Sequence, residues 1–468
     1  MSASSPLQHT HCGDDLAVTN PATGQCCATV ELASVAEVTA AVHSADLAQR
    51  AWRQRPAIER AECLRAMANA LLAQTEAIAT ALAEETGKSL DDARAEVHYG
   101  AEIVRYHAEW ARRIEGEIIP SDNPREKLFL HREPLGVVVA LIPFNFPIYT
   151  LLRKVAPALI TGNTVVVRPS NHTPVSALRL AQAVQAALPE GVLQMLVMDH
   201  PVCAHLCTQP AVRMITLTGS LHAGRQVLEY AKAHMARCSL ELGGKTPAIV
   251  MADADLDRAA ADIVRSRLSH CGQLCTAVER VLVDRRVHDA LLDRLRQAMT
   301  AVAWGDRSVH PERMGPLVSA EARARVHAMV ERAQDEGAVL EIGGTVPEGP
   351  GFFYPPTLLS ACTPTMEIVR EEVFGPVLAL LPFEGAEEAL HLANDHQYGL
   401  SSVLYTRDHA LAQRFAAEIE AGELYINRTP ADPYQGYHAG WRRSGIGGDD
   451  GKHGMLAFTQ TRLVVMPY

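Results

Sequence analysis

The sequence predicts an α/β protein with two α/β domains, the first of them Rossmann-like, and a small β extension. From residue 136, short runs of β-branched residues alternate with helical patterns, which is typical of βαβ units around a parallel sheet. A second alternating series begins after Gly243 and Gly244. Two segments, 118–135 and 456–468, resemble strands that belong to neither series, and they predict the extension.

The first quarter of the chain is predicted to be mostly helical. Ser34 and Glu37 form the pattern of a capping box, and apolar residues follow them at helical spacing. Further amphipathic stretches, rich in alanine and leucine, cover residues 58–86 and 90–114.

The two alternating series define the predicted domains. In the first series, strands are expected at 137–142, 164–167, 193–197 and 214–218, with helices around 151–159, 175–188 and 225–234. The second has strands at 248–251 and 278–283, each followed by a helix, from Asp253 and from Val287. We therefore assign 14–117 and 136–243 to the first domain, 244–443 to the second, and 118–135 with 456–468 to the extension. Appended strands often pair between subunits, so we expect a homodimer or homotetramer.

The composition narrows the class of protein. The chain has 468 residues, 48% hydrophobic, with a formal net charge of -11, so no nucleic-acid or anionic membrane partner is indicated. No run of about 18 uncharged apolar residues occurs, and the first residues lack the order of a secretory signal. We expect a cytoplasmic protein.

Ten cysteines are scattered along the chain and are expected to be reduced thiols. Two pairs, Cys203 with Cys207 and Cys271 with Cys275, are four residues apart. Neither pair has a second pair at zinc-like spacing, so no metal site is predicted.

Cys275 is the candidate nucleophile. It follows a Gly-Gln turn at 272–273, where exposed backbone N–H groups lower the pKa of a thiol and can also face an oxyanion. The alternative is a structural thiol, because a free cysteine usually packs as a small hydrophobic side chain.

Two further residues suit acyl chemistry. Glu241 ends an apolar run just before paired glycines, where partial burial raises a carboxyl pKa toward the range of a general base. Asn145 lies in a rigid Pro-Phe-Asn-Phe-Pro loop after a strand, and its amide can donate a hydrogen bond to developing negative charge. The alternatives are a salt-bridged glutamate at a domain junction and a turn-forming asparagine.

A phosphate site is suggested by the turn at 218–224, which leads from a strand into a helix. It carries Gly219, Ser220 and Gly224, but it does not fit the G-x-G-x-x-G pattern of dinucleotide-binding turns.

These elements occur together with further motifs: Pro-Ala-Leu at 157–159, Gly-Asn-Thr at 162–164, Glu-Leu-Gly-Gly-Lys at 241–245, Gly-Gln-Leu-Cys at 272–275, Glu-Glu-Val-Phe-Gly-Pro at 371–376 and Ser-Gly-Ile-Gly at 444–447. In this order they resemble the aldehyde dehydrogenase superfamily, over nearly the whole chain from about Thr19. The resemblance implies the aldehyde dehydrogenase fold, with a dinucleotide-binding domain, a catalytic domain and oligomerisation strands.

The resemblance also implies roles for the catalytic candidates. Cys275 attacks an aldehyde, and Asn145 with the Cys275 backbone N–H holds the oxyanion of the adduct. Hydride then leaves for the nicotinamide, and Glu241 activates the water that hydrolyses the resulting thioester. Lys154 matches a motif position of the superfamily, but the sequence gives it no chemical role.

Cofactor contacts are implied in the same way. Glu372 matches the residue that holds the nicotinamide ribose, Phe374 packs beside it, and Gly219 and Ser220 match the turn at the pyrophosphate.

One segment departs from the superfamily pattern. Where Lys-Pro-Ser-Glu is usual, this chain has Arg168, Pro169, Ser170 and Asn171. The usual glutamate favours NAD, because it bonds the ribose hydroxyls and repels a 2′-phosphate. Arg168 can instead bind that phosphate. We expect NAD as cofactor, with NADP tolerated or preferred.

Within the superfamily, the chain most resembles lactaldehyde and glycolaldehyde dehydrogenases. The likeness rests on segments 106–119, 425–428 and 435–448. Arg153 and His438 match polar positions of that subgroup's substrate pocket, which suits a small aldehyde with a hydroxyl or carboxylate beside it. Asp432 replaces a glutamate of the subgroup, and Thr276 beside the nucleophile replaces an expected asparagine, so a short semialdehyde is also possible. The alternatives for Arg153 and His438 are a helix-surface ion pair and a subunit bridge.

Two other readings of the function stay open. One is a catalytically idle family member that acts as a binding or structural protein, although Cys275, Glu241 and Asn145 are all present. The other is a cysteine hydrolase that pairs Cys275 with a histidine and needs no nucleotide. Nucleotide-dependent absorbance change separates a dehydrogenase from both.

Overall fold

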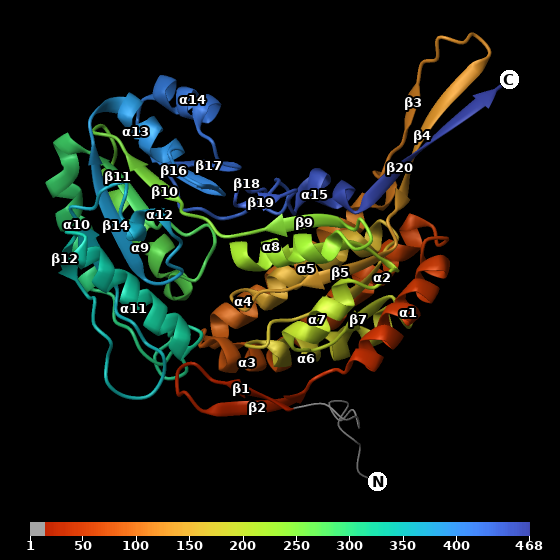
Figure 1. Ribbon diagram of the computed structural model, residues 1–468, viewed down its shortest axis with the longest axis horizontal. Coiled ribbons are helices and arrows are strands. Elements are labelled where there is room, and N and C mark those ends of the chain that lie inside the picture. The colour runs from red at the N-terminus through yellow and green to blue at the C-terminus, as the bar shows by residue number, and fades with distance from the viewer. Residues whose placement is uncertain (1–14) are drawn as a thin grey trace.

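The computed structural model describes residues 15–468 and divides them into two lobes, each built on a large β-sheet (Figure 1). Residue 14, where the first domain was predicted to begin, lies just outside this range. Two α/β units and a small β extension are observed, so the predicted fold class is confirmed. Within the described range, no helix is long and apolar enough to cross a membrane.

The sheet of the first lobe has six strands in the order β19-β9-β8-β5-β6-β7. Its strands are β5 (Val137–Leu141), β6 (Thr164–Arg168), β7 (Leu193–Met195), β8 (Val212–Thr218), β9 (Arg237–Glu241) and β19 (Gly445–Ile446). All neighbours are parallel except β19, which is antiparallel to β9. The strand order reverses between β5 and β8, as in a Rossmann fold, and ligands bind such sheets at the carboxyl ends of the strands at this point.

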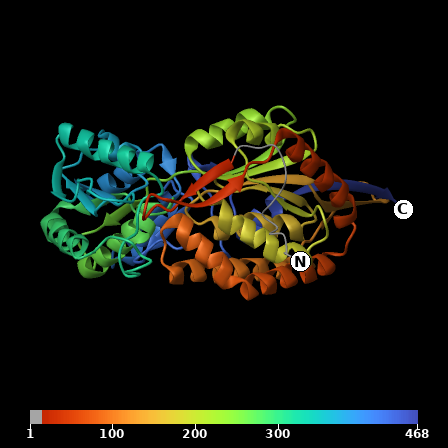
Figure 2. The ribbon, with the colours of Figure 1, turned by 90° about the horizontal axis from the view of Figure 1, so that it is seen from below.

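Helices cover both faces of this sheet (Figure 2), which explains why β5 is a continuous apolar run with every residue buried. The helices of this lobe are α1 (Val35–Trp52), α2 (Ala57–Ala73), α3 (Thr75–Thr86), α4 (Leu90–Ala108), α5 (Pro147–Ile160), α6 (Pro174–Val184), α7 (His200–Cys207) and α8 (Leu221–Ala231). The predicted capping box is present at the start of α1. The stretch predicted at 58–86 is two helices, because the backbone leaves the helical conformation at Gln74.

The sheet of the second lobe has seven strands in the order β12-β13-β14-β11-β10-β16-β17. They are β10 (Pro247–Val250), β11 (Arg280–Asp284), β12 (Val339–Ile342), β13 (Thr357–Ser360), β14 (Val377–Phe383), β16 (Ser401–Tyr405) and β17 (Glu423–Ile426). Its helices are α9 (Leu256–Leu268), α10 (His288–Thr300), α11 (Ala320–Asp335), α12 (Glu367–Arg370), α13 (Gly385–Asn394) and α14 (His409–Glu418). The chain passes from the first sheet to the second between β9 and β10.

Three strands form a separate antiparallel sheet that projects from the first lobe (Figure 1). They are β3 (Glu117–Ile119), β4 (Glu126–Pro134) and β20 (Thr459–Pro467), in the order β20-β4-β3. Two shorter pairs complete the strands: β1 (Asp15–Thr19) with β2 (Cys26–Glu31), and β15 (Tyr398–Gly399) with β18 (Trp441–Arg442). Pairing of the projecting sheet between subunits and the domain boundaries stay predictions.

Candidate active site

Several of the predicted site residues follow the carboxyl ends of strands in the first sheet. Asn145 lies in the loop after β5, Gly219 and Ser220 follow β8, and Glu241 is the last residue of β9. Because these strands are parallel neighbours, their ends lie at one edge. The Rossmann topology therefore brings residues from distant parts of the sequence to the position where such sheets bind ligands.

Cys275 approaches this edge on a loop of the second lobe, between α9 and β11. The backbone just before it is unusual: His270 and Cys271 have φ values of 45° and 55°, and Gly272 has 74°. Such left-handed conformations are costly for residues other than glycine and persist where the surroundings fix them. The amide of Asn145 donates to the Gln273 carbonyl at 2.8 Å, so the two loops are joined directly.

The Glu241 carboxylate is buried at the junction of the two loops. Its Oε1 accepts the Asp449 backbone N–H at 3.0 Å, and its Oε2 accepts the Thr218 hydroxyl at 3.4 Å. The same Oε2 lies 3.6 Å from the Arg153 guanidinium and 3.7 Å from His438 Nε2. Burial raises the pKa of the Cys275 thiol, and the charge of Glu241 adds to this effect. The three catalytic candidates are thus brought together in one site.

Two consecutive buried cations face two consecutive buried carboxylates beside Glu241. Arg153 and Lys154 are adjacent on α5, and Asp449 and Asp450 precede α15 (Gly451–Ala457). The Arg153 guanidinium binds Asp450 through two nitrogens, and Lys154 Nζ lies 2.6 Å from Asp449 Oδ2. Burial raises the pKa of both aspartates, and the cations oppose this effect.

This arrangement gives Lys154 a structural partner that the sequence did not provide. Its Nζ also donates to Thr216 on β8 at 3.0 Å, so it connects α5 to the sheet and to the C-terminal segment. Arg153 forms a buried ion pair with Asp450, and not an ion pair on a helix surface. The acidic partners Asp449 and Asp450 were missed, although a Gly-Asp-Asp-Gly sequence beside a matched motif was a visible signal.

Replacing Arg153 by leucine is expected to destabilise the protein by about 3–5 kcal/mol, because it leaves buried carboxylates without their counterion. Arg105 is the matched control, since it is a helical arginine in an exposed pair with Glu102, and its replacement by leucine is expected to cost about 1 kcal/mol or less. Thermal unfolding of both variants measures the difference. Equal melting temperatures would show that Arg153 is not needed to compensate Asp450.

His438 is buried within the chain, in the same site. Its Nδ1 bonds Glu423 Oε1 at 2.8 Å and lies 3.7 Å from Asp432 Oδ2. Burial lowers the pKa of His438, but the carboxylates of Asp432 and Glu241 outweigh it and raise that pKa well above its usual value. Glu423 was not predicted; it is the first residue of β17 and belongs to none of the motifs.

Glu423, Asp432 and His438 are close enough together to share a cation, and they are the single such group in residues 15–468. His438 Nδ1 is already engaged by Glu423, and the other Glu423 oxygen accepts the Tyr425 hydroxyl at 2.9 Å. The prediction that the protein has no metal site is not tested by this geometry. Thr276, the remaining substrate candidate, is buried beside Cys275.

The residues predicted to hold a nucleotide lie along the same sheet edge. Arg168 ends β6, and its Nη2 donates to the Asn171 side chain at 3.0 Å and to the Met198 carbonyl at 3.3 Å. Its buried Nε has no hydrogen-bond partner among the described residues. Ser170 accepts the backbone N–H of His172 at 3.2 Å. One buried nitrogen of Arg168 therefore makes no hydrogen bond at the end of β6 within the described part of the chain.

The turn after β8 is built around a helix N-terminus. Ser220 caps α8 by accepting the Ala223 N–H at 3.2 Å, and the Gly219 N–H donates to the Glu241 carbonyl. At Gly224 a Cβ would come within 2.7 Å of the Leu242 side chain, so the glycine allows close packing of α8 on the sheet. The predicted strand-turn-helix context is present, and a helix N-terminus attracts phosphate.

Glu372 and Phe374 reach the site from the second lobe, in the loop before β14. Glu372 Oε1 accepts the Gly244 N–H at 3.2 Å, and burial together with Glu279 raises the Glu372 pKa to about 8. Phe374 stacks edge-on against Phe144, with ring centroids 6.0 Å apart. Glu279, which the sequence did not single out, fixes this loop by accepting the Phe374 N–H at 2.9 Å.

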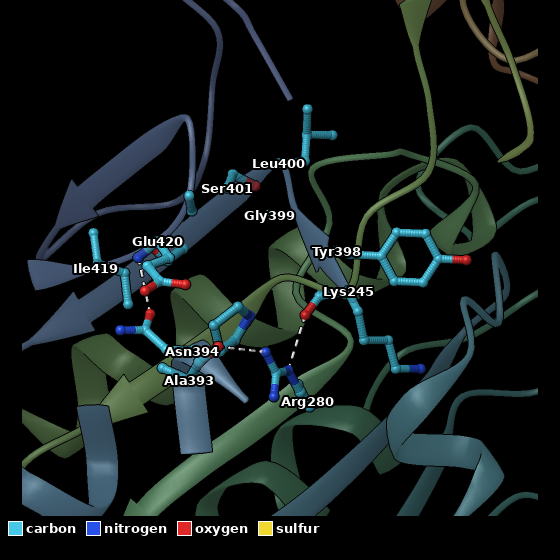
Figure 3. Close-up of a pocket in the computed structure, with 13 residues that line it drawn as sticks. Lys245, Arg280, Ala393, Asn394, Tyr398, Gly399, Leu400, Ser401, Ile419 and Glu420 are labelled. Atoms are coloured by element: carbon cyan, nitrogen blue, oxygen red, sulfur yellow. Dashed lines mark hydrogen bonds between the residues drawn. The ribbon is translucent and has the colours of Figure 1, made fainter. Parts of the chain in front are cut away.

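A separate small cavity lies next to Lys245, in the second lobe (Figure 3). It has room for about 10 Å³, which is the scale of one water molecule. Arg280 fixes its wall by donating to the carbonyls of Lys245 and Ala393 at 3.0 and 2.9 Å. The Lys245 ammonium points away and binds Glu279 at 2.6 Å. None of the site residues predicted from the sequence lines this cavity.

Comparison with known proteins identifies relatives over nearly the whole chain. The model of the family described as "Aldehyde dehydrogenase family" matches residues 9–464. Lactaldehyde dehydrogenase of Escherichia coli (strain K12) is 42% identical over 452 residues, which cover 96% of this chain and 94% of that protein. D-glyceraldehyde dehydrogenase (NADP(+)) of Thermoplasma acidophilum is 34% identical over 456 residues, covering 96% and 92%. A solved structure of lactaldehyde dehydrogenase superposes with a TM-score of 0.96 at 42% identity, covering 97% of this chain and 96% of that one.

Proposed function

Since the chain belongs to the aldehyde dehydrogenase family, we propose that it oxidises a small polar aldehyde to the carboxylic acid through a thioester on Cys275, with NAD or NADP as oxidant. The substrates considered are lactaldehyde, glycolaldehyde and a short semialdehyde. The single observation that carries the proposal is the convergence of Cys275, Asn145 and Glu241 at the carboxyl edge of the first sheet.

Cys275, Asn145 and Glu241 each act in a different step of the proposed reaction. The Cys275 thiolate attacks the carbonyl carbon of the aldehyde, and the Asn145 amide, now bonded to the Gln273 carbonyl, turns to donate to the oxyanion. A bound nicotinamide supplies the acceptor for the hydride that leaves the adduct. Glu241 then takes a proton from water, which attacks the thioester and releases the acid and the thiolate.

The residues present fit a dinucleotide. The capped N-terminus of α8 at Ser220 suits a pyrophosphate, and the partly buried guanidinium of Arg168 at the end of β6 suits an adenosine ribose or its 2′-phosphate. Glu372 and Phe374 would hold the nicotinamide end from the second lobe. Asn171 stands where the superfamily usually has a glutamate, so the side chain at this position does not repel a 2′-phosphate.

Asn171→Glu is expected to lower the efficiency with NADP relative to NAD by about tenfold or more, which corresponds to about 1.4 kcal/mol. The new carboxylate would repel the 2′-phosphate and accept the ribose hydroxyls of NAD. The ratio of kcat/KM values for the two nucleotides, at saturating aldehyde, measures the change, and Asn171→Gln is the neutral control. An unchanged ratio, or a wild-type preference for NAD of tenfold or more, would contradict NADP use.

Charge in the pocket favours a hydroxyaldehyde over an acidic semialdehyde. Arg153 is compensated by Asp450 and lies within 4.0 Å of Asp449, Glu241 and Asp432, so it has no free charge for a substrate carboxylate. Desolvating a substrate carboxylate among these groups would cost more than the arginine returns. A neutral hydroxyl of the substrate can still donate a hydrogen bond to the Asp432 carboxylate or form one with the His438 imidazole.

The test is NAD(P)H formation by purified protein with each nucleotide and a panel of aldehydes. We expect turnover of glycolaldehyde and lactaldehyde, with kcat/KM at least about tenfold above that for succinate semialdehyde, a difference of about 1.4 kcal/mol. Faster turnover of the semialdehyde would overturn the charge argument. No nucleotide reduction with any aldehyde would favour an idle family member, and ester cleavage alone would favour a hydrolase. A cytoplasmic location and a homo-oligomeric state belong to the same proposal.

A further inference from the structure

One buried carboxylate, that of Glu279, binds groups from three separate segments of the chain. Its Oε2 accepts hydrogen bonds from Lys245 Nζ at 2.6 Å and from the Val373 N–H at 2.9 Å. Its Oε1 accepts the Phe374 N–H at 2.9 Å and lies 3.0 Å from the Arg267 guanidinium. Glu279 is 2% exposed, so these groups take the place of water around its charge. Each oxygen therefore has one cationic partner and one backbone partner, which fixes the carboxylate in place.

The partners of Glu279 belong to the segments that carry the proposed chemistry. The two N–H donors lie in residues 371–376, the nucleotide loop, which contains the residue proposed to hold the nicotinamide ribose. Arg267 donates to the Gly272 carbonyl in residues 272–275, the nucleophile loop. Lys245 ends the Glu-Leu-Gly-Gly-Lys motif, which begins with the proposed base. One carboxylate thus joins all three segments.

The same segments are in direct backbone contact. At Gly272 a Cβ would come within 2.3 Å of the Gly375 carbonyl oxygen. At Gly244 it would come within 2.5 Å of the Cys275 carbonyl oxygen. Each glycine therefore lets the backbone of another segment approach closely. The spacing between the loops is set by these backbone contacts and by the Glu279 carboxylate.

The nucleophile loop has anchors that do not involve Glu279. The Gln273 side chain accepts the Val318 N–H at 2.9 Å, and the Gln273 carbonyl accepts the Asn145 amide at 2.8 Å. In the nucleotide loop, by contrast, two consecutive N–H groups have the Glu279 carboxylate as their acceptor. Removing this carboxylate is therefore expected to displace the nucleotide loop more than the nucleophile.

We propose that Glu279 is a positioning residue for hydride transfer, because it holds the nucleotide loop at a fixed spacing from the Cys275 loop. Hydride passes between atoms only when they are close and aligned, so a small displacement of the nucleotide loop slows this step strongly. The attack of Cys275 on a carbon atom does not use the nucleotide loop and keeps its rate. The inference rests on the proposed function, in which a nicotinamide accepts the hydride.

The experiment compares full-length Glu279→Gln with wild type. The glutamine has nearly the same shape, but its NH₂ group cannot accept one of the two N–H bonds, and its charge no longer compensates Lys245 and Arg267. At saturating nucleotide and glycolaldehyde, we expect the burst of NAD(P)H to slow at least about tenfold. Glycolaldehyde deuterated at C1 should then show a full primary isotope effect on the burst, which identifies hydride transfer as the slowed step.

Two further measurements do not depend on turnover. Hydrogen exchange, followed by mass spectrometry, is expected to be at least about tenfold faster in the peptide that contains the nucleotide loop of the variant. Alkylation of Cys275 by iodoacetamide in the nucleotide-free protein should stay within about threefold of wild type. Slower alkylation, in step with the slower burst, would show that the nucleophile itself was disturbed and would contradict the proposal.

Glu85→Gln is the matched control. Glu85 is another buried carboxylate that accepts two consecutive backbone N–H groups, those of Val175 and Ser176 at 2.9 and 3.0 Å. Both variants are expected to lose stability, but only Glu279→Gln should slow the burst. If Glu279→Gln does not fold, Lys245→Met combined with Glu279→Gln keeps the net charge of the cluster, since one cation and one anion are removed together. This double variant should show the same slow burst.

A folded Glu279 variant with the burst rate of wild type would overturn the proposal, whatever its hydrogen exchange. Wild-type protein that reduces no nucleotide with any aldehyde would instead fail the proposed function. The hydrogen-exchange comparison would still be informative in that case, because equal exchange of the nucleotide loop in both proteins would show that Glu279 does not hold it.

Discussion

Cys275→Ala is expected to reduce aldehyde-dependent NAD(P)H formation by at least about four orders of magnitude, because no other group can form the acyl intermediate. Cys275 is half-buried on the loop joined to Asn145, and alanine fits the same backbone. The assay follows nucleotide reduction with glycolaldehyde or whichever aldehyde the wild type prefers. Nucleotide binding, measured by fluorescence quenching, should persist in the variant.

The matched control is Cys271→Ala, which removes the other thiol of the pair four residues earlier. Cys271 is buried, and burial raises the pKa of its thiol well above the usual range. It belongs to the hydrophobic core of the second lobe, which suits a packing role. We expect the Cys271 variant to keep activity within about tenfold of wild type, with some loss of stability. Equal loss in both variants would indicate damage to the loop instead of loss of the nucleophile.

Glu241→Gln is expected to slow steady-state turnover by about 10²–10⁴-fold while leaving the first turnover nearly intact. The amide keeps the bond from the Asp449 N–H but cannot take a proton from water. One equivalent of NAD(P)H per active site should appear as a burst, followed by a slow phase. The acylated Cys275 peptide should then accumulate and be visible by mass spectrometry after acid quenching.

Glu372→Gln provides the comparison, because Glu372 is proposed to hold the nucleotide and not the water. That variant should weaken nucleotide binding and lower the burst and the steady state together. A Glu241 variant that loses its burst would place Glu241 before hydride transfer, and one with normal turnover would exclude it as the base.

The sequence allowed the fold class to be predicted because its signals are local. Buried β-branched runs such as β5, the capping box at Ser34 and the glycine turn before α8 each depend on a few neighbouring residues. The candidates Cys275, Glu241 and Asn145 were found through short motifs. The sequence did not predict the helix break at Gln74. The composition stays rich in alanine and leucine across it, whereas the backbone leaves the helical conformation there.

By itself, the sequence determined which chemistry is available: a thiol, a carboxylate and an amide on loops that follow regular elements, and an arginine in place of the usual lysine at 168. Only the tertiary structure decided what surrounds them. Asp450 compensates Arg153 across 297 residues, and Glu423 and Asp432 surround His438. Burial and charge depend on which segments the fold packs together, so the arginine and the histidine that the sequence placed in the pocket are surrounded by carboxylates in the folded protein.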